Sequence, residues 1–181
     1  MGCLFVFCMA ILSDRDIRKR LEKESIEITP DIREEQIQPG SLDVRLGEDY
    51  TNEDSGEIFE DVDEVVIKPW QFYLGHTMDK IKLPADLSAM VSGRSSWGRK
   101  GLLIHATAGW VDAGFSADTE NGSDITLEIF NLSTEEIRIK PGERIGQLVF
   151  FEMSSPAEEP YNKKSNAKYN EQEGPTPSRI D

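Results

Sequence analysis

The chain has 181 residues, of which 38% are hydrophobic and 30% are charged, a balance typical of one globular domain with its own core. Its 34 acidic and 20 basic residues give a formal net charge of −14, and residues 31–64 alone hold 13 acidic residues and two arginines. Such an acidic surface repels nucleic acid, so we expect no nucleic-acid partner.

The first eight residues, MGCLFVFC, hold both cysteines of the chain and no charged side chain. Two thiols so close together do not make a disulfide framework, which favours a reducing, cytoplasmic location. The apolar run from Cys3 to Leu12 is too short to span a bilayer and no basic region precedes it, so we expect no membrane segment. We interpret residues 1–8 as an upstream extension and residues 9–181 as a single domain.

The sequence predicts one helix, which begins after Ser13 and runs to about Glu24. Ser13 is a suitable N-cap with Asp16 three residues later, and Leu12 can pack on Ile17 across the cap. Short β-type runs separated by turn residues then fill the chain, at 26–28, 41–46, 65–67, 71–76, 87–92, 102–106, 125–131, 135–139 and 146–153. This pattern is typical of an all-β sandwich, jelly roll or distorted barrel.

Residues 92–101, SGRSSWGRKG, contain three cations and no acid in an otherwise acidic chain. Arginine side chains bind phosphate oxygens through paired hydrogen bonds, hydroxyls add donors, and glycines let backbone N–H groups approach a ligand. The composition therefore favours a site for a compact polyanion such as a nucleoside triphosphate. A flexible, solvated basic loop is the alternative that these residues alone leave open.

Residues 124–131, DITLEIFN, predict a strand whose isoleucine and leucine side chains alternate toward the core. Glu128 then lies in the middle of the opposite face. Because a partly buried carboxylate is costly unless it is paired, Glu128 is a candidate functional acid. An ordinary solvent-facing glutamate on an antiparallel sheet is the alternative.

Residues 105–115, HATAGWVDAGF, combine small residues and glycines with two aromatic side chains, which predicts a pocket with backbone walls and aromatic sides. Asp112 can accept a hydrogen bond from a sugar hydroxyl or activate a water molecule. The alternative is a tight turn with core aromatics, in which Asp112 only caps the turn. The wide separation of His76 and His105, without an HxE or CxxC pattern, predicts no zinc site.

In this order, the segments resemble the dCTP deaminase family of the dUTPase-like superfamily. The likeness covers nearly the whole chain from Met9 onward, through AILSDRDI, QPGSLDVRLG, GRSSWGR, HATAGWVDAGF, TLEI, PGERIGQL and PYNKKSNAKYNEQEGPTPSRI. It implies a homotrimer with an all-β fold, a distorted β-barrel or jelly roll of the β-clip type with an N-terminal helix, and active sites between subunits.

The resemblance also implies roles for individual residues. Glu128 is expected to accept a proton from a water held by Ser95 and the backbone carbonyl of Ala108, while Asp112 contacts the deoxyribose or bound water. Residues 161–181 are expected to form a lid that orders over the triphosphate. The implied nucleotide-binding residues are Arg94, Ser95, Ser96, Trp97, Gly98, Arg99, Asp112, Thr126, Leu127, Glu128, Gln147, Tyr161, Lys168 and Gln172.

Members of the family either stop at dUTP and ammonia or continue to dUMP and diphosphate. The pair Gly109 and Trp110 resembles the dUMP-forming type, so we expect deamination of dCTP followed by diphosphate release. A deaminase that stops at dUTP, a plain dUTPase and a non-catalytic nucleotide-binding β protein are the alternatives. The resemblance further implies Mg²⁺ carried on the triphosphate, and dTTP as a candidate inhibitor.

Two regions depart from the family pattern. The acidic segment SADTENGSD, residues 116–124, is longer than the usual turn, and we expect a surface hairpin extension there. It lies close in sequence to Asp112 and Glu128, so it bears on the shape of the pocket. The acidic segment 48–64 also matches the family only loosely.

Overall fold

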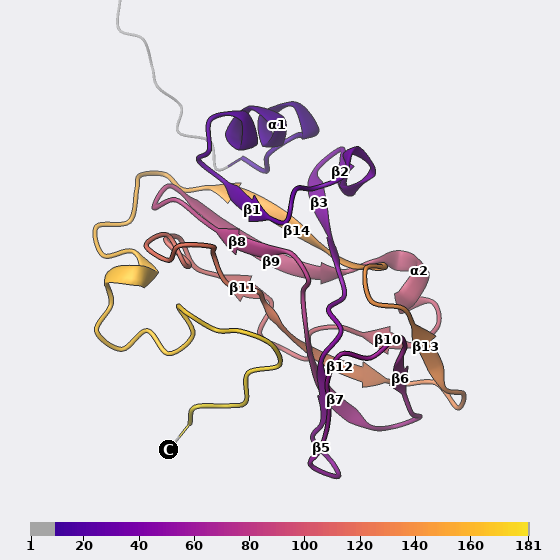
Figure 1. Ribbon diagram of the computed structural model, residues 1–181. Helices are drawn as coiled ribbons and strands as arrows, with labels where there is room; N and C mark the ends of the chain where they lie inside the picture. Colours follow the sequence, from indigo (N-terminus) through magenta and orange to yellow (C-terminus); the bar gives the residue numbers. More distant parts are fainter. Residues whose placement is uncertain (1–9, 181) are drawn as a thin grey trace, which may run out of the picture.

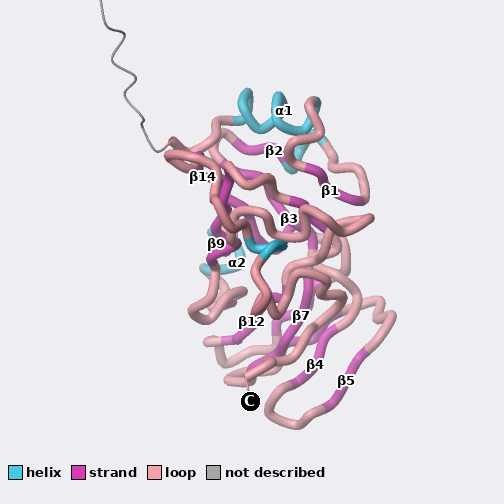
Figure 2. Tube along the Cα trace, turned by 90° about the vertical axis from the view of Figure 1, so that its left-hand side faces the viewer, coloured by secondary structure: helices cyan, strands magenta, loops and turns pink. Residues whose placement is uncertain are grey.

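Residues 10–180 are described in a computed structural model, and they form short antiparallel β-strands joined by turns, with one helix near the N-terminus (Figure 1). Two five-stranded sheets make up most of the fold. In Figure 2 the strands β3, β9 and β14 lie above β4, β5, β7 and β12. The described part of the chain contains no helix long and apolar enough to cross a membrane. The expectations for residues 1–8, cysteines included, fall outside the described residues.

Helix α1 (Asp14–Glu22) begins as predicted, with Ser13 as its N-cap. The Ser13 hydroxyl accepts a hydrogen bond from the backbone N–H of Asp16 at 3.4 Å and donates one to the Asp16 carboxylate at 3.0 Å. Ile17 is fully buried on the inner face of the helix. The helix ends two residues before the predicted Glu24, which has a left-handed φ of 53° that a helix cannot accommodate.

The first sheet has the strand order β11-β9-β14-β3-β2, and every neighbouring pair is antiparallel. The long strand β14 lies at its centre, paired with β9 on one side and β3 on the other. The five strands are β2 (Ile37–Gln38), β3 (Ser41–Arg45), β9 (Leu87–Gly93), β11 (Trp110–Val111) and β14 (Arg144–Glu152).

The second sheet has the order β10-β12-β7-β4-β5, again with antiparallel neighbours. Strand β12 carries Glu128, which lies opposite Leu74 of β7. The five strands are β4 (Tyr50–Asn52), β5 (Glu57–Phe59), β7 (Phe72–His76), β10 (Leu102–Leu103) and β12 (Thr126–Asn131).

Two small two-stranded pairs and three short helical turns complete the fold. One pair joins β1 (Glu27–Thr29) to β8 (Lys80–Lys82), and the other joins β6 (Val65–Ile67) to β13 (Ile137–Ile139). The helical turns are η1 (Glu34–Gln36), α2 (Ser95–Gly98) and η2 (Tyr161–Lys163).

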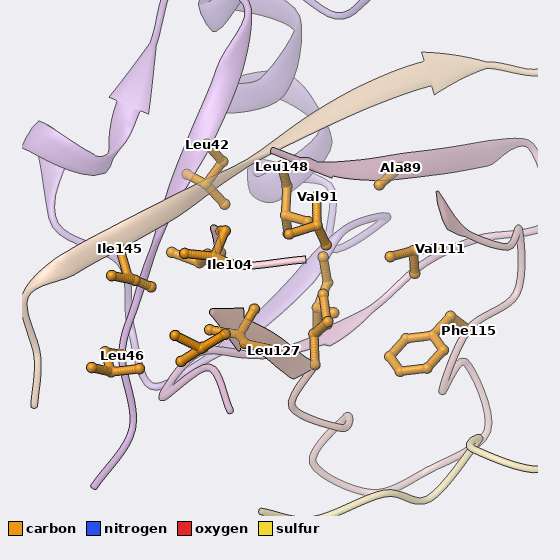
Figure 3. Close-up of a cluster of buried hydrophobic side chains, with 14 of the residues drawn as sticks. Leu42, Leu46, Ala89, Val91, Ile104, Val111, Phe115, Leu127, Ile145 and Leu148 are labelled. Carbon is orange, nitrogen blue, oxygen red and sulfur yellow. The ribbon is translucent and has the colours of Figure 1, made fainter. Parts of the chain in front are cut away.

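The hydrophobic core lies between the two sheets (Figure 3). Val91 and Leu148 enter it from the first sheet and Leu127 from the second, each no more than 3% exposed. Ile104, in the segment after β10, fills space next to them. Burying each such side chain stabilises the fold by about 1.5–3 kcal/mol, so the alternation seen in the sequence determines which face of each strand turns inward.

One charged pair is buried beside this core. The Arg45 guanidinium and backbone N–H both contact the carboxylate of Asp79, at 2.6–3.0 Å, and both side chains are at most 6% exposed. Gln36 donates a hydrogen bond to the backbone carbonyl of Asp43 close by. These contacts hold η1 and the turn before β8, which contains Asp79, against β3.

The outer side of the first sheet carries several exposed or half-buried apolar side chains. Met90 lies opposite Val149 on one side and Trp110 on the other, and the Trp110 ring lies 5.5 Å from that of Phe151. Ile11 forms a bridge to Phe151. Met90, Trp110 and Ile11 are 39%, 53% and 56% exposed. We call these five residues the outer apolar face.

The predicted all-β class and the main strands are confirmed, and the differences concern short or polar elements. The strands at Ile37–Gln38, Tyr50–Asn52, Glu57–Phe59, Lys80–Lys82 and Trp110–Val111 were not predicted. The predicted run 102–106 is a strand only at Leu102–Leu103. The basic loop is ordered by a helical turn, α2, in which the backbone N–H groups of Trp97 and Gly98 both donate to the Arg94 carbonyl.

The expected surface hairpin at 116–124 is wrong. The segment consists of turns and bends, and its one β-bridge joins Ser123 to Ile81 rather than to a second strand of its own. Ser116, Ser123 and Asp124 are each no more than 1% exposed. They are buried because the C-terminal segment packs against them, a contact between distant segments that local sequence does not reveal.

Candidate active site

A cavity of about 510 Å³ opens beside strand β12, and its walls come mainly from three segments that are far apart in the sequence. These are β12 with its neighbour β7, the segment 105–115, and the tail, by which we mean residues 161–180. The lining residues are Glu53, Phe72, Leu74, Ala108, Trp110, Val111, Asp112, Phe115, Ile125, Thr126, Glu128, Tyr161, Tyr169, Gln172, Thr176, Ser178 and Ile180.

Glu128 reaches this cavity from the middle of β12. Burial alternates along the strand, so that Leu127 and Ile129 enter the core while Thr126 and Glu128 are half-buried on the cavity side. The Oε2 atom of Glu128 accepts hydrogen bonds from the backbone N–H groups of Ala106 at 2.8 Å and Thr107 at 3.2 Å. Two donors on one oxygen hold the carboxylate in place at the cavity wall.

The segment that supplies these donors is held against the first sheet by close backbone contact. The backbone N–H of Val91 donates to the Gly109 carbonyl at 2.6 Å, and Trp110 pairs with Met90 in β9. A Cβ atom on Gly109 would lie 2.8 Å from the Val91 carbonyl oxygen, so glycine is required here by the approach of β9. Packing against β9 therefore explains the glycine at position 109, independently of any influence that Gly109 has on which reaction is catalysed.

The tail forms the remaining wall. The Tyr161 backbone N–H donates to the Ala113 carbonyl at 2.8 Å, and the Tyr161 ring lies 6.1 Å from that of Phe115. Farther along, Gln172 donates to the Asp124 carbonyl at 2.7 Å and the Thr176 backbone N–H to the Thr126 hydroxyl at 3.3 Å. In Figure 1 the yellow tail runs back toward the second sheet before it turns away to the lower left.

A second group of the predicted residues lines another cavity, of about 640 Å³, on the first sheet. Arg94, Ser95 and Ser96 come from the start of α2, and Gln147 comes from the centre of β14. The two cavities have no lining residue in common. Within one chain, the arginine-bearing loop and Glu128 therefore belong to separate sites.

Asp43 is a residue of the second cavity that the sequence analysis did not single out. Its carboxylate is 1% exposed and lies 3.3 Å from the Arg94 guanidinium and 3.2 Å from that of Arg144. Burial raises the pKa of Asp43, and the two guanidinium groups oppose this effect. An acid inside the apolar alternation of QPGSLDVRLG was the signal that could have identified it.

The other predicted site residues are placed as follows. Trp97 donates from its indole N–H to the Arg144 carbonyl at 3.1 Å, and Lys100 lies over its ring. Leu127 is buried in the core, so only its backbone can contribute to a site. Lys168 does not line the Glu128 cavity, and its ammonium donates to the Arg179 carbonyl at 2.6 Å. Gly98, the last residue of α2, and Arg99, its C-cap, are both exposed.

Comparison with known proteins identifies the family of this chain. Residues 11–153 match the family described as dCTP deaminase-like. The chain belongs to the dCTP deaminase-like family. Relatives in this family include "dCTP deaminase, dUMP-forming" of Dictyoglomus thermophilum, 43% identical with 94% of each chain covered, and the protein of the same name from Halobacterium salinarum, 42% identical with the same coverage. The Natronomonas pharaonis relative, 40% identical over 94% of each chain, is named simply "dCTP deaminase".

Solved structures support the fold. The 2'-deoxycytidine 5'-triphosphate deaminase of Agrobacterium tumefaciens aligns with a TM-score of 0.66 and 24% identity, covering 80% of this chain. The present chain spans about half, 48%, of the length of the Agrobacterium chain. The EIAV dUTPase aligns with a TM-score of 0.51 and 20% identity, covering 78% of this chain and 98% of its own. The dUTPase-like β fold expected from the sequence is therefore confirmed.

Proposed function

We propose that the protein hydrolyses dCTP to dUTP and ammonia and then releases diphosphate to give dUMP, which supplies dUMP for thymidylate synthesis and limits dUTP. The observation that carries this proposal is the position of Glu128, half-buried at a cavity with one carboxylate oxygen held by two backbone N–H groups. The relatives named as dUMP-forming deaminases over 94% of the chain support the same activity.

In the proposed deamination, the cytosine ring enters the cavity that Glu128 and Ala108 line. Glu128 accepts a proton from a water molecule held by the Ala108 carbonyl and the Ser95 hydroxyl, and the water oxygen attacks C4 of the ring. The same carboxylate delivers this proton to N3. It then transfers the proton of the new C4 hydroxyl group to the amino nitrogen, so that the C4–N bond breaks, ammonia leaves and C4 becomes a carbonyl carbon. A general acid–base group of this kind contributes about 10²–10⁴-fold to the rate.

We propose that the second half of the site comes from a neighbouring subunit of a homotrimer. The two cavities are separate within one chain, and the outer apolar face borders both, through Trp110 on the Glu128 side and through Ile11 and Val149 on the Arg94 side. Covering that face with a second copy removes exposed apolar surface from water and brings the two cavities of different subunits together.

The triphosphate is assigned to the cationic loop, where Arg94 and the hydroxyls of Ser95 and Ser96 line the second cavity. Mg²⁺ enters as part of the substrate, bound to the phosphate oxygens that it prefers as ligands. The tail acts as the lid, because it already forms one wall of the Glu128 cavity. We place this nucleotide chemistry in the cytoplasm, with dTTP as a candidate inhibitor of the same site.

The second reaction distinguishes this proposal from its nearest alternative. Trp110 and the exposed Asp112 both line the cavity, and Asp112 is proposed to orient the water that attacks the α-phosphate. A deaminase that stops at dUTP is the second candidate, because one relative at 40% identity is named simply dCTP deaminase.

The deciding experiment incubates the protein with dCTP and Mg²⁺ and follows ammonia, dUTP, dUMP and diphosphate over time. Ammonia released together with dUMP and diphosphate, with little free dUTP, is the expected result. Accumulation of dUTP would support the deaminase that stops there, and conversion of added dUTP alone would indicate a dUTPase. No product from either nucleotide would refute an enzymatic function and leave nucleotide binding.

A further inference from the structure

The acidic segment 116–124, which departs from the family pattern, forms a surface against which one residue of the tail is held. That residue is Asn170, and its backbone carbonyl accepts hydrogen bonds from two hydroxyls, Ser116 at 2.6 Å and Ser123 at 2.9 Å. Both serines are no more than 1% exposed. Two buried donors converging on one carbonyl from opposite ends of the segment make a contact well suited to hold the tail.

The side chain of Asn170 is engaged as fully as its backbone. Its Oδ1 accepts from the backbone N–H of Ser116 at 3.0 Å, and its Nδ2 donates to the carboxylate of Asp118 at 3.0 Å. The Asn170 amide holds the pKa of the Asp118 carboxyl below its ordinary value. The segment requires a side chain that both donates and accepts a hydrogen bond, as the asparagine amide does. Neither aspartate nor leucine can do both.

The segment has a defined shape of its own before the tail is considered. Ser116 has a left-handed φ of 53°, and its carbonyl accepts from the Thr119 hydroxyl at 2.8 Å. The Gly122 backbone N–H donates to the Thr119 hydroxyl at 3.0 Å. At Gly122, with a φ of 76°, a Cβ atom would lie 3.0 Å from the Ile81 backbone. These contacts fix the spacing between Ser116 and Ser123.

Asp124, at the end of the segment, extends the contact toward the cavity. Its carboxylate accepts from the Gly174 backbone N–H at 2.8 Å and lies 3.1 Å from the His76 ring, while its carbonyl accepts from Gln172 at 2.7 Å. Farther along the tail, Thr176, Ser178 and Ile180 line the Glu128 cavity. Residues 170–174 are therefore the anchored part of the tail, and cavity-lining residues lie within it and on both sides of it.

We propose that Asn170 is a positioning residue for the nucleotide cavity and that residues 116–124 are its docking segment, which holds the tail over Glu128. Asn170 does not line the cavity and acts through the residues that follow it. The inference rests on the proposed function, because the placement of this wall affects turnover only if nucleotide binds in the Glu128 cavity. The docking itself is a property of the chain without ligand.

The test uses the full-length protein and the substitution Asn170→Asp. The new carboxylate cannot donate to Asp118 and places a second negative charge beside it, while the size of the side chain is kept. We expect faster hydrogen exchange in the peptide 170–176 without nucleotide, about a tenfold rise in the KM for dCTP, and a kcat within about twofold of the original. Ser123→Ala removes one donor to the Asn170 carbonyl. It should raise the exchange rate of the peptide and the KM for dCTP in the same direction as Asn170→Asp, but by less.

Rescue separates docking from general damage. Adding Asp118→Asn to the Asn170→Asp variant restores one donor and one acceptor with reversed direction, so exchange and KM should return toward the original values. Thr134→Asp, which adds the same negative charge at an exposed position outside the tail and the docking segment, is the control and should change neither. Unchanged exchange in Asn170→Asp, an equal effect in the control, or failure of the rescue would each overturn the proposal.

Failure of the proposed function gives a different result from failure of the docking. If the original protein releases no ammonia from dCTP, the proposed function is refuted, while exchange in the peptide 170–176 still decides whether Asn170 is docked. If the original protein is active and exchange in Asn170→Asp is unchanged, the activity stands and the docking is refuted.

Discussion

The Nε atom of Arg94 lies 3.3 Å from a carboxylate oxygen of Asp43, which is almost completely buried. Arg94 is the first cation of the basic loop. The buried carboxylate of Asp43 therefore orients the guanidinium group that we assign to triphosphate binding. We expect Asp43→Asn to raise the KM for dCTP about tenfold, since the ion pair that orients Arg94 is lost. Steady-state kinetics measure this.

The matched control for that substitution is Asp63→Asn, which removes the same charge at an exposed position. Binding of deoxycytidine, which has no phosphate, should be the same in both variants. An Asp43→Asn variant with the original KM would show that Arg94 needs no support from this acid.

Asp43 also predicts how stability depends on pH. Burial raises the folded-state pKa of Asp43 above its ordinary value of 3.8. The folded protein therefore binds this proton more tightly than the unfolded chain does. The resulting stabilisation is fully present below pH 3.8 and is lost as the pH rises through the folded-state pKa. The difference in unfolding free energy between the original protein and Asp43→Asn should therefore fall over this window and then stay constant. Denaturant titrations at several pH values measure it, and a difference that increases with pH would contradict the assignment.

Glu128→Gln tests the proposed acid–base group. The amide oxygen can still accept from Ala106 and Thr107, but the side chain can no longer take a proton from water. We expect dCTP binding to persist while kcat for ammonia release falls by about 10²–10⁴-fold. Calorimetry and an ammonia assay measure the two effects. Glu135→Gln, at an exposed position, should have no effect, and substantial turnover in Glu128→Gln would remove the acid from the mechanism.

Mixing two inactive variants tests whether the site is shared between subunits. Ser95→Ala and Glu128→Gln each leave one half of the site intact, so subunits exchanged between them form some sites with both residues. With random mixing in a closed trimer, about one quarter of the sites should regain Ser95 and Glu128 together. The assay follows ammonia release after brief denaturation and refolding of the mixture. Activity no higher than that of the separate variants would place both residues in one subunit.

Gly109→Ala tests the packing reason for that glycine. The added methyl group would lie 2.8 Å from the Val91 carbonyl oxygen, so β9 and the 105–115 segment must separate. We expect the free energy of unfolding to fall by about 1–3 kcal/mol. Gly98→Ala is the control, because no atom lies within 4 Å of its added methyl group and alanine favours the helical turn. Equal stability of the two variants would show that the backbone contact is easily relaxed.

Local patterns were sufficient for much of the fold. The Ser13 cap and the alternation in 87–92, 125–131 and 146–153 predicted α1 and three strands, because these depend on nearest neighbours along the chain. The strand Lys80–Lys82 was missed because its polar residues acquire strand character only by pairing with Glu27–Thr29. Pairing between distant segments is a property of the folded chain.

The same division holds for the site. The sequence by itself determined which residue types are present and in what order: a cationic loop, an acid on the outer side of a strand, and a tail rich in polar groups. Only the tertiary structure decided that Arg94 and Glu128 lie in separate cavities, that Asp43 is buried beside Arg94, and that 116–124 receives the tail. The physical reason is that alternation specifies which side of a strand is buried, whereas the meeting of distant segments depends on how the completed sheets pack and which polar groups they leave to be satisfied.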